Sequence, residues 1–259
     1  MIDVVSGVLG LIIGSFLNVV IWRVPRDESV VRPPSHCPSC DQPISPRDNV
    51  PVLSWLLLRG RCRRCQARIS IRYPLVELAT AGIFVAFAVH FGPHASLPAF
   101  LYLAGVGVAL TMIDLDVQRL PDKLTLPSYP VGLALLGIAA GVDGAGWPYA
   151  RALIGMAALF GFYATLWFVY PAGMGLGDVK LAGVLGLYLG WLSWSALVVG
   201  AASAFLVGAV VSISVVVAKG GNRKTKVPFG PFMLLGVLIA TFAAHPISHA
   251  YLHSFRRSG

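Results

Sequence analysis

The chain has 259 residues, of which 56% are hydrophobic and only 12% are charged, whereas an ordinary soluble domain carries about 25% charged residues. So few charges exclude a water-soluble globular protein of this size. The net charge of +9 indicates membrane topology rather than nucleic-acid binding, because Lys and Arg collect on the cytoplasmic side of membrane proteins. We therefore expect a membrane protein with no nucleic-acid partner.

Eight apolar segments approach the roughly 20 residues that a membrane-spanning helix needs. They are Val4–Trp22, Pro74–Phe91, Leu97–Ile113, Leu124–Val142, Ala150–Tyr170, Val179–Gly190, Ser193–Ala218 and Phe229–Ala244. The first has no basic region before it and no small-x-small cleavage site after it, so we expect a permanent span. A tight turn near Gly190-Trp191 separates the sixth and seventh, since one helix over both would overshoot the bilayer. The sequence predicts an all-α polytopic membrane protein with about eight transmembrane helices.

The basic residues predict the orientation of these spans. With the N-terminus outside, 17 of the 20 Lys and Arg residues fall on the cytoplasmic side, as the positive-inside rule requires. Ten of them are the arginines from Arg23 to Arg72, and a further group is Lys219, Arg223, Lys224 and Lys226. The three exceptions are Arg151, Arg256 and Arg257. We expect an outside N-terminus.

The one sizeable extramembrane segment is Arg23–Tyr73, an insert between the first and second spans that we expect to be cytoplasmic. It contains all four cysteines, in the pattern Cys37-Pro-Ser-Cys40 and Cys62-Arg-Arg-Cys65, which is close to the spacing of a four-cysteine zinc site. Disulfides are disfavoured in a reducing cytoplasm, and redox-active dithiols are the other alternative. A short segment needs such a staple because it buries little core. The sequence predicts a structural zinc ion.

Four arginines lie near the second cysteine pair, and they either offset the charge of a zinc tetrathiolate or bind lipid headgroups. They are Arg59, Arg61, Arg63 and Arg64. The chain thus divides into a first transmembrane helix (1–22), a zinc-binding insert (23–73) and a membrane domain (74–259). Membrane lipids are expected partners, and the sequence leaves the oligomeric state open.

Two aspartates stand out in the membrane domain, because an ionisable group at membrane depth is a functional hypothesis by default. Asp114 closes the third span, and Asp178 lies in Gly175-Leu-Gly-Asp just before the sixth. With the orientation above, both belong to the cytoplasmic end of the bundle. Two carboxylates brought together would share one proton and could hydrolyse a peptide by general acid–base catalysis. The alternative is a pair of helix caps or interfacial anchors, and the residues alone do not show that the two meet.

The neighbouring carboxylates have simpler explanations. Asp116 lies about 200° around a helix from Asp114, so at most one of them faces a partner. Asp122 follows Pro121 and opens the next predicted helix, where we expect an N-cap.

Several motifs, spread over nearly the whole chain, together resemble the type IV prepilin peptidases, also called leader peptidase/N-methyltransferases. They are Gly14–Arg23 in the first span; Ser35–Cys40, Asn49–Trp55, Leu58–Cys62 and Ile71–Glu77 in the insert; Ile113–Asp116, Leu120–Asp122 and Gly175–Lys180 around the aspartates; and Pro228–Pro231 before the last span.

The resemblance implies an activity and a pair of catalytic residues. In that family the aspartate that begins D-x-x-x-x-x-L-P-D and the aspartate of G-x-G-D are catalytic, which here are Asp114 and Asp178. It implies cleavage, on the cytoplasmic side of the bacterial inner membrane, of the short basic leader of type IV prepilins and type II secretion pseudopilins. It also implies methylation of the new N-terminal residue with S-adenosylmethionine, because the cysteine insert is intact.

Alternatives to this interpretation remain. The chain contains no Rossmann-type glycine fingerprint, and the candidates for the methyl-donor site are Asn18, Arg23 and Glu77, each of which also suits structural anchoring. A peptidase without methyltransferase activity, or a proton-coupled transporter that uses the two aspartates as relay groups, are the other functions considered.

Overall fold

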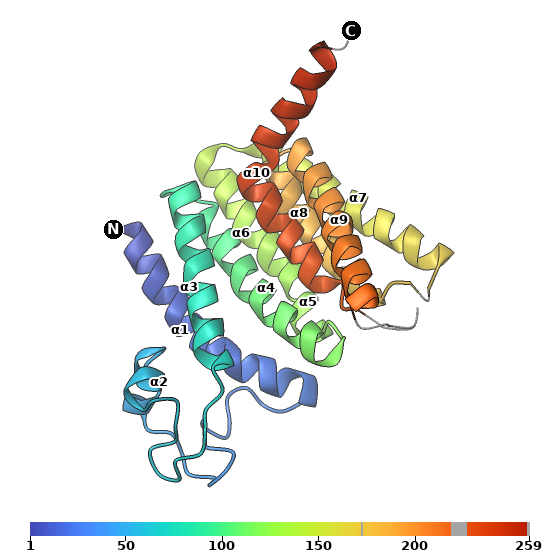
Figure 1. Cartoon of the computed structure of the whole chain (residues 1–259). Coiled ribbons are helices and arrows are strands. Elements are labelled where there is room, and N and C mark those ends of the chain that lie inside the picture. The colour runs from blue at the N-terminus through green and yellow to red at the C-terminus, as the bar shows by residue number, and fades with distance from the viewer. Residues whose placement is uncertain (172, 219–226, 258–259) are drawn as a thin grey trace. The chain divides into compact units, whose positions relative to one another are not determined.

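The computed structural model describes residues 1–171, 173–218 and 227–257, and the side chains as far as Ala244. The described chain is helical, with two isolated β-bridges in the insert and no β-strand. Its helices are α1 (Ile2–Arg23), α2 (Leu53–Leu57), α3 (Arg72–Phe91), α4 (Leu97–Val117), α5 (Asp122–Thr125), α6 (Ser128–Asp143), α7 (Gly146–Val169), α8 (Leu176–Leu192), α9 (Trp194–Ala218) and α10 (Gly230–Arg257). Figure 1 shows them in chain order from blue to red.

Six of these helical segments are long and apolar enough to cross a membrane. They match the first five predicted spans and the seventh. The predicted sixth span is α8, which has only 17 residues but is buried along nearly its whole length, and the eighth is the apolar part of α10, Gly230–Ala244. An all-helical membrane fold is confirmed, and within the described residues six helices, rather than the predicted eight, have the length and composition of a span. Lys219, Arg223, Lys224 and Lys226, used to predict the orientation, lie outside the described residues.

The turn between the sixth and seventh predicted spans lies later than expected. α8 continues through Gly190 to Leu192, and the chain reverses at Ser193, whose hydroxyl accepts a hydrogen bond from the Ala196 N–H at 2.9 Å. Hydropathy does not register this capping interaction, which sets the start of α9.

The chain forms two compact units, Met1–Ala109 and Leu110–Gly259, and the boundary falls within α4. In the first unit α1 packs closely against α3. A Cβ atom added at Gly10 would lie 2.6 Å from the Ala81 Cα, and one at Gly14 would lie 2.7 Å from the Glu77 Cα. The insert between these two helices contains the short helix α2, which Figure 1 shows in light blue.

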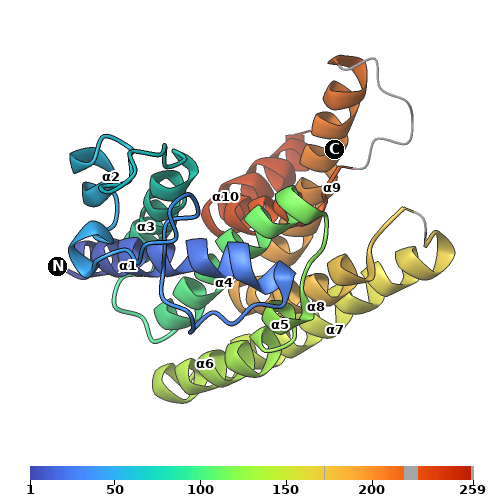
Figure 2. The same cartoon turned by 90° about the horizontal axis from the view of Figure 1, so that it is seen from below.

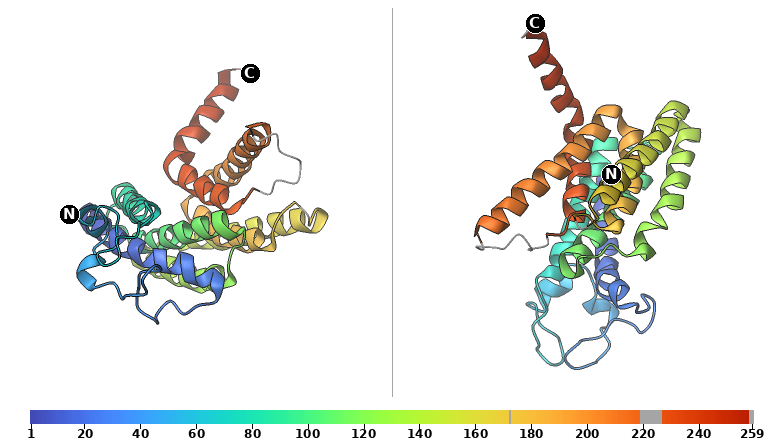
Figure 3. Two further views of the ribbon diagram at one scale, coloured as in Figure 1. Left: turned by 60° about the horizontal axis from the view of Figure 1, so that its bottom comes forward. Right: turned by 90° about the vertical axis from the view of Figure 1, so that its right-hand side faces the viewer.

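In the second unit α8 packs against α7, and α10 packs against α9. Figure 2 shows α6, α7 and α8 running side by side, and both views of Figure 3 show α10 extending beyond the end of α9. The α7–α8 contact is made through Gly155, Gly186 and Gly190, which bring the two backbones together. Small residues at the interface are typical of membrane helices, because close packing replaces the hydrophobic effect there.

Arg151, an exception to the predicted charge distribution, has a structural role in this contact. Its guanidinium on α7 donates to the carbonyl oxygens of Gly190 and Trp191 at 2.6 Å and of Leu192 at 2.8 Å. These carbonyls belong to the last turn of α8, where backbone acceptors lack helical partners and carry partial negative charge. Arg151 therefore caps the C-terminal end of α8.

The tight α7–α8 contact predicts that Gly155→Ala destabilises the membrane domain by about 1–3 kcal/mol, the usual cost of overpacking. The new Cβ would lie 2.5 Å from the Gly186 carbonyl oxygen and 3.0 Å from the Gly190 Cα. Gly161→Ala, on the same helix, is the control, since no heavy atom lies within 4 Å of its Cβ position. Denaturant unfolding in mixed micelles measures both, and equal stabilities would contradict the packing assigned to α7 and α8.

Candidate aspartate site and four-cysteine cluster

Asp114 lies in the last turn of α4 and is buried, with 5% of its surface exposed. Its Oδ2 accepts a hydrogen bond from the backbone N–H of Gly230 at 3.0 Å. The helix ends because Gln118 adopts a left-handed conformation, with φ of 53°. The chain then turns back beside the aspartate.

Asp178 lies in the first turn of α8 and is half-buried. Its Oδ2 accepts a hydrogen bond from the Gly175 N–H at 3.0 Å, as one half of a capping box. Asp178 therefore has the capping role that the sequence left as an alternative. It is also close enough to Asp114 for the two negative charges to repel each other. The structure thus brings the two predicted aspartates together within the second unit.

Leu120 joins the segments that carry these aspartates. A Cβ atom at Gly177 would lie 3.0 Å from the Leu120 Cβ. A Cβ atom at Gly230 would lie 2.8 Å from the Asp114 Oδ2 and 3.2 Å from the Leu120 Cδ2. Both glycines are therefore needed for close approach of backbone to the site.

A salt bridge also links the two aspartate motifs. The Lys180 Nζ donates to both carboxylate oxygens of Asp122, at 2.7 and 2.9 Å. The prediction that Asp122 is an N-cap is wrong, because Pro121 occupies that position without a side-chain cap and Asp122 is the first residue of α5. The side chain turns to the Lys180 ammonium instead of to its own backbone. Asp116 is exposed whereas Asp114 is buried, which agrees with only one of them facing the interior.

Two residues of this site were missed by sequence reasoning. Gly230 lies in the Pro228–Pro231 motif, which the resemblance had included without a role. Tyr163 of α7 is 2% exposed and close enough to Asp178 for the two groups to interact electrostatically. Its signal is weak, because a tyrosine within an apolar span is read as part of the core.

The four cysteine sulfurs lie within 4.8 Å of one another. The Cys37 and Cys65 sulfurs are 3.7 Å apart, and a tetrahedral site with Zn–S bonds of about 2.3 Å sets sulfurs about 3.8 Å apart. None of the four is in a disulfide. The geometry therefore fits a tetrahedral metal ion.

Two turns of the same shape present these cysteines. The residue after each C-x2-C unit has a left-handed conformation, with φ of 56° at Asp41 and 59° at Gln66. The N–H of Asp41 donates to the Cys37 carbonyl at 2.8 Å, and that of Gln66 donates to the Cys62 carbonyl at 3.0 Å. The repeated turn is a structural reason for the repeated spacing.

The thiols of the cluster do not ionise equally without a cation. The backbone N–H groups of Cys65 and Arg64 lower the pKa of the Cys62 thiol to about 6. The pKa of the Cys40 thiol rises to about 11, although the Gln42 backbone N–H lowers it, because burial and the other three thiols disfavour its charged form. A bound metal ion supplies the positive charge that four adjacent thiolates need.

The three candidates for the methyl-donor site lie in the first unit, in different surroundings. The Asn18 amide donates to the carbonyls of Gly14 at 3.3 Å and Tyr73 at 3.2 Å, so it anchors the start of α3 to α1. Arg23 is 7% exposed and donates to the Ser29 carbonyl at 2.9 Å.

Glu77 is also 7% exposed and links α3 to both of its neighbours. Its Oε2 accepts from the Val52 N–H of the insert at 2.7 Å, and it accepts a hydrogen bond from the Ser15 hydroxyl of α1. All three residues thus have structural partners, and Arg23 also lines a cavity.

Comparisons with known proteins match one family domain to the part of the chain with the cysteine cluster and another to the part with the two aspartates. Residues 8–91 match the bacterial peptidase A24 N-terminal domain, and residues 99–213 match the type IV leader peptidase family. A prepilin leader peptidase/N-methyltransferase of Aeromonas hydrophila is 41% identical over 95% of this chain and 92% of its own. One of Neisseria gonorrhoeae is 40% identical over 87% and 85%.

A third relative has a slightly different description. The type 4 prepilin-like proteins leader peptide-processing enzyme of Escherichia coli O78:H11 is 40% identical over 90% of this chain and 91% of its own. No solved structure matches. The relatives are about 40% identical over nearly the whole chain, and two family domains match. This multi-pass membrane protein therefore belongs to the type IV leader peptidase family, peptidase A24.

Proposed function

We propose that this protein cleaves the basic leader of type IV prepilins and type II secretion pseudopilins and then methylates the new N-terminal residue. The observation that carries the peptidase half is the convergence of Asp114, Asp178 and Gly230, from three separate segments of the second unit. The site lies at the cytoplasmic end of the bundle in the bacterial inner membrane, with the N-terminus in the periplasm. The distribution of basic residues supports this orientation.

In this proposal the two carboxylates share one proton. The ionised aspartate takes a proton from water, and the protonated one donates a hydrogen bond to the scissile carbonyl. The hydroxide equivalent attacks that carbonyl, and the amine of the mature N-terminus leaves after it is protonated. Backbone donors from Gly230 and Gly175 fix the two side chains, so little reorganisation is needed during reaction.

The methyltransferase half rests on the insert. The four cysteines would hold a structural zinc ion, because their separations suit a closed four-thiolate site with no open position for chemistry. S-adenosylmethionine would supply an electrophilic methyl group to the freed amine. The retained cysteine cluster supports both activities over cleavage alone.

The shared-proton arrangement predicts that Asp114→Asn and Asp178→Asn each lower leader cleavage by about 10²–10⁴-fold. Asp116→Asn, two residues away and exposed, is the matched control and should cleave like the wild type. Mass spectrometry of a prepilin incubated with each protein in proteoliposomes measures the product. If either aspartate variant is folded and zinc-loaded and still cleaves at the wild-type rate, the assignment of Asp114 and Asp178 as the catalytic pair is wrong.

The four-thiolate arrangement predicts that Cys65→Ser loses zinc and methylation while leader cleavage persists. Removal of a ligand should lower the affinity for zinc by more than roughly 10–100-fold, which is the usual cost of losing a residue that only hydrogen-bonds a ligand. Cleavage persists because Asp114 and Asp178 both belong to the other compact unit.

The control for this variant is Ser39→Ala, an exposed change between the first two cysteines. Metal analysis and product mass separate the outcomes. Full zinc content in the Cys65→Ser protein would contradict the assigned ligand set.

A further inference from the structure

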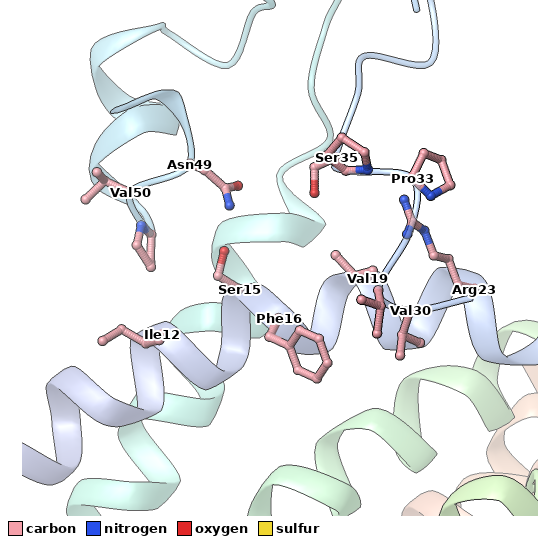
Figure 4. Close-up of a pocket in the computed structure, with 13 residues that line it drawn as sticks. Ile12, Ser15, Phe16, Val19, Arg23, Val30, Pro33, Ser35, Asn49 and Val50 are labelled. Atoms are coloured by element: carbon pink, nitrogen blue, oxygen red, sulfur yellow. The ribbon is translucent and has the colours of Figure 1, made fainter. Parts of the chain in front are cut away.

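A cavity of about 440 Å³ lies in the first unit between α1 and two segments of the insert. Its lining consists of Ile12, Ser15, Phe16, Val19 and Arg23 from α1, and Val30, Val31, Pro33, Pro34, Ser35, Asn49, Val50 and Pro51 from the insert. Figure 4 shows the Ser15 side chain on α1 pointing toward Asn49, with Ser35 to the right of both and Arg23 at the right, reaching toward Pro33. The volume falls within the range of small-molecule sites, about 300–1,000 Å³.

The cavity contains one buried positive charge. Arg23 is 7% exposed, none of the lining residues is acidic, and Arg23 forms no ion pair among the described residues. Its guanidinium donates a hydrogen bond to the neutral carbonyl of Ser29. A guanidinium has five N–H donors and binds carboxylates in a planar fork. A buried charge without an ionised partner is costly, so the cavity suits a ligand that brings a carboxylate.

The other walls suit the remaining parts of such a ligand. Valine and proline side chains give an apolar surface, and the Phe16 ring offers a face that attracts a cation. Ser15, Ser35 and Asn49 add a few polar groups of the kind that fix the orientation of a base or a ribose. A carboxylate, a sulfonium cation and a nucleoside are combined in S-adenosylmethionine, and these residues fit that molecule.

We propose that this cavity binds the methyl donor and that Arg23 holds its carboxylate. The inference rests on the proposed methyl transfer and gives it a site. In the transfer the neutral N-terminal amine attacks the methyl carbon, the N–C bond forms and the C–S bond breaks, and its electrons neutralise the sulfur. The positive charge passes from the sulfur to the methylated nitrogen. An N-terminal amine has a pKa of about 7.7–8.0, so roughly a tenth of it is already neutral at pH 7 and can attack.

Glu77 is a positioning residue for the same cavity. It accepts hydrogen bonds from Ser15, which lines the cavity, and from Val52, which follows the lining segment 49–51. One carboxylate thereby fixes both walls. It does not line the cavity itself.

The test measures binding of S-adenosylmethionine and of its decarboxylated analogue to the full-length protein by calorimetry. The wild type should bind the decarboxylated analogue about ten- to a hundredfold more weakly, the usual worth of a charge-assisted contact. Arg23→Gln should lower the affinity for S-adenosylmethionine by the same factor, so that this variant binds the two ligands equally.

Arg26→Gln is the matched control, because Arg26 lies three residues later and is exposed. Its guanidinium carbon lies 3.6 Å from the centroid of the Trp22 ring. This variant should bind both ligands like the wild type. If Arg23→Gln does not retain zinc and a cooperative unfolding transition, Arg23→Lys and the wild-type preference for the carboxylate supply the test.

Equal binding of the two ligands by the wild type, or undiminished binding by Arg23→Gln, would overturn the assignment of Arg23. If the wild type methylates a cleaved pilin in that case, the proposed function survives and only the site fails. If the wild type neither binds the donor nor methylates, the methyltransferase proposal fails together with the site.

Discussion

The hydrogen bond from the Gly230 N–H to the Asp114 carboxylate joins the start of α10 to the end of α4 and holds the buried aspartate of the candidate site. A carboxylate at membrane depth needs donors, because no bulk water replaces its lost hydration. The donor comes from the first residue of α10, where backbone N–H groups lack helical partners and carry partial positive charge. Asp178 is held in the same way by Gly175 at the start of α8. The carboxylates therefore lie at helix ends, where backbone donors are available.

Side chains hold α8 at both of its ends. Asp178 caps its first turn and Arg151 caps its last, so an anion lies at the N-terminus and a cation at the C-terminus. Both agree with the helix dipole. Between the caps, glycine contacts bring α8 against the backbone of α7. A helix held in this way can be short and still place its aspartate accurately, which explains why 17 residues suffice.

The sequence predicted the local features of this protein well. Continuous apolar runs located the helices, and the cysteine spacing predicted a cluster that the structure brings within 4.8 Å. The contact between Asp114 and Gly230 could not be predicted from the residues, because the two are 116 positions apart and only tertiary packing brings them together. The N-cap expected at Asp122 was wrong for the same reason, since the competing partner, Lys180, lies 58 residues away.

In the insert, a chain of contacts runs from the four-cysteine cluster to the wall of the cavity. Arg63 lies between Cys62 and Cys65 in the sequence. Its guanidinium donates hydrogen bonds to both carboxylate oxygens of Asp48, at 2.7–3.0 Å. The pairing lowers the pKa of the Asp48 carboxyl, so both partners stay charged near neutral pH. Asp48 immediately precedes the lining segment 49–51 of the cavity. Glu77 holds the other end of this segment by its hydrogen bond with the Val52 N–H. In the proposed function, the cysteine cluster would therefore influence the cavity through the backbone that it orders, without lining it.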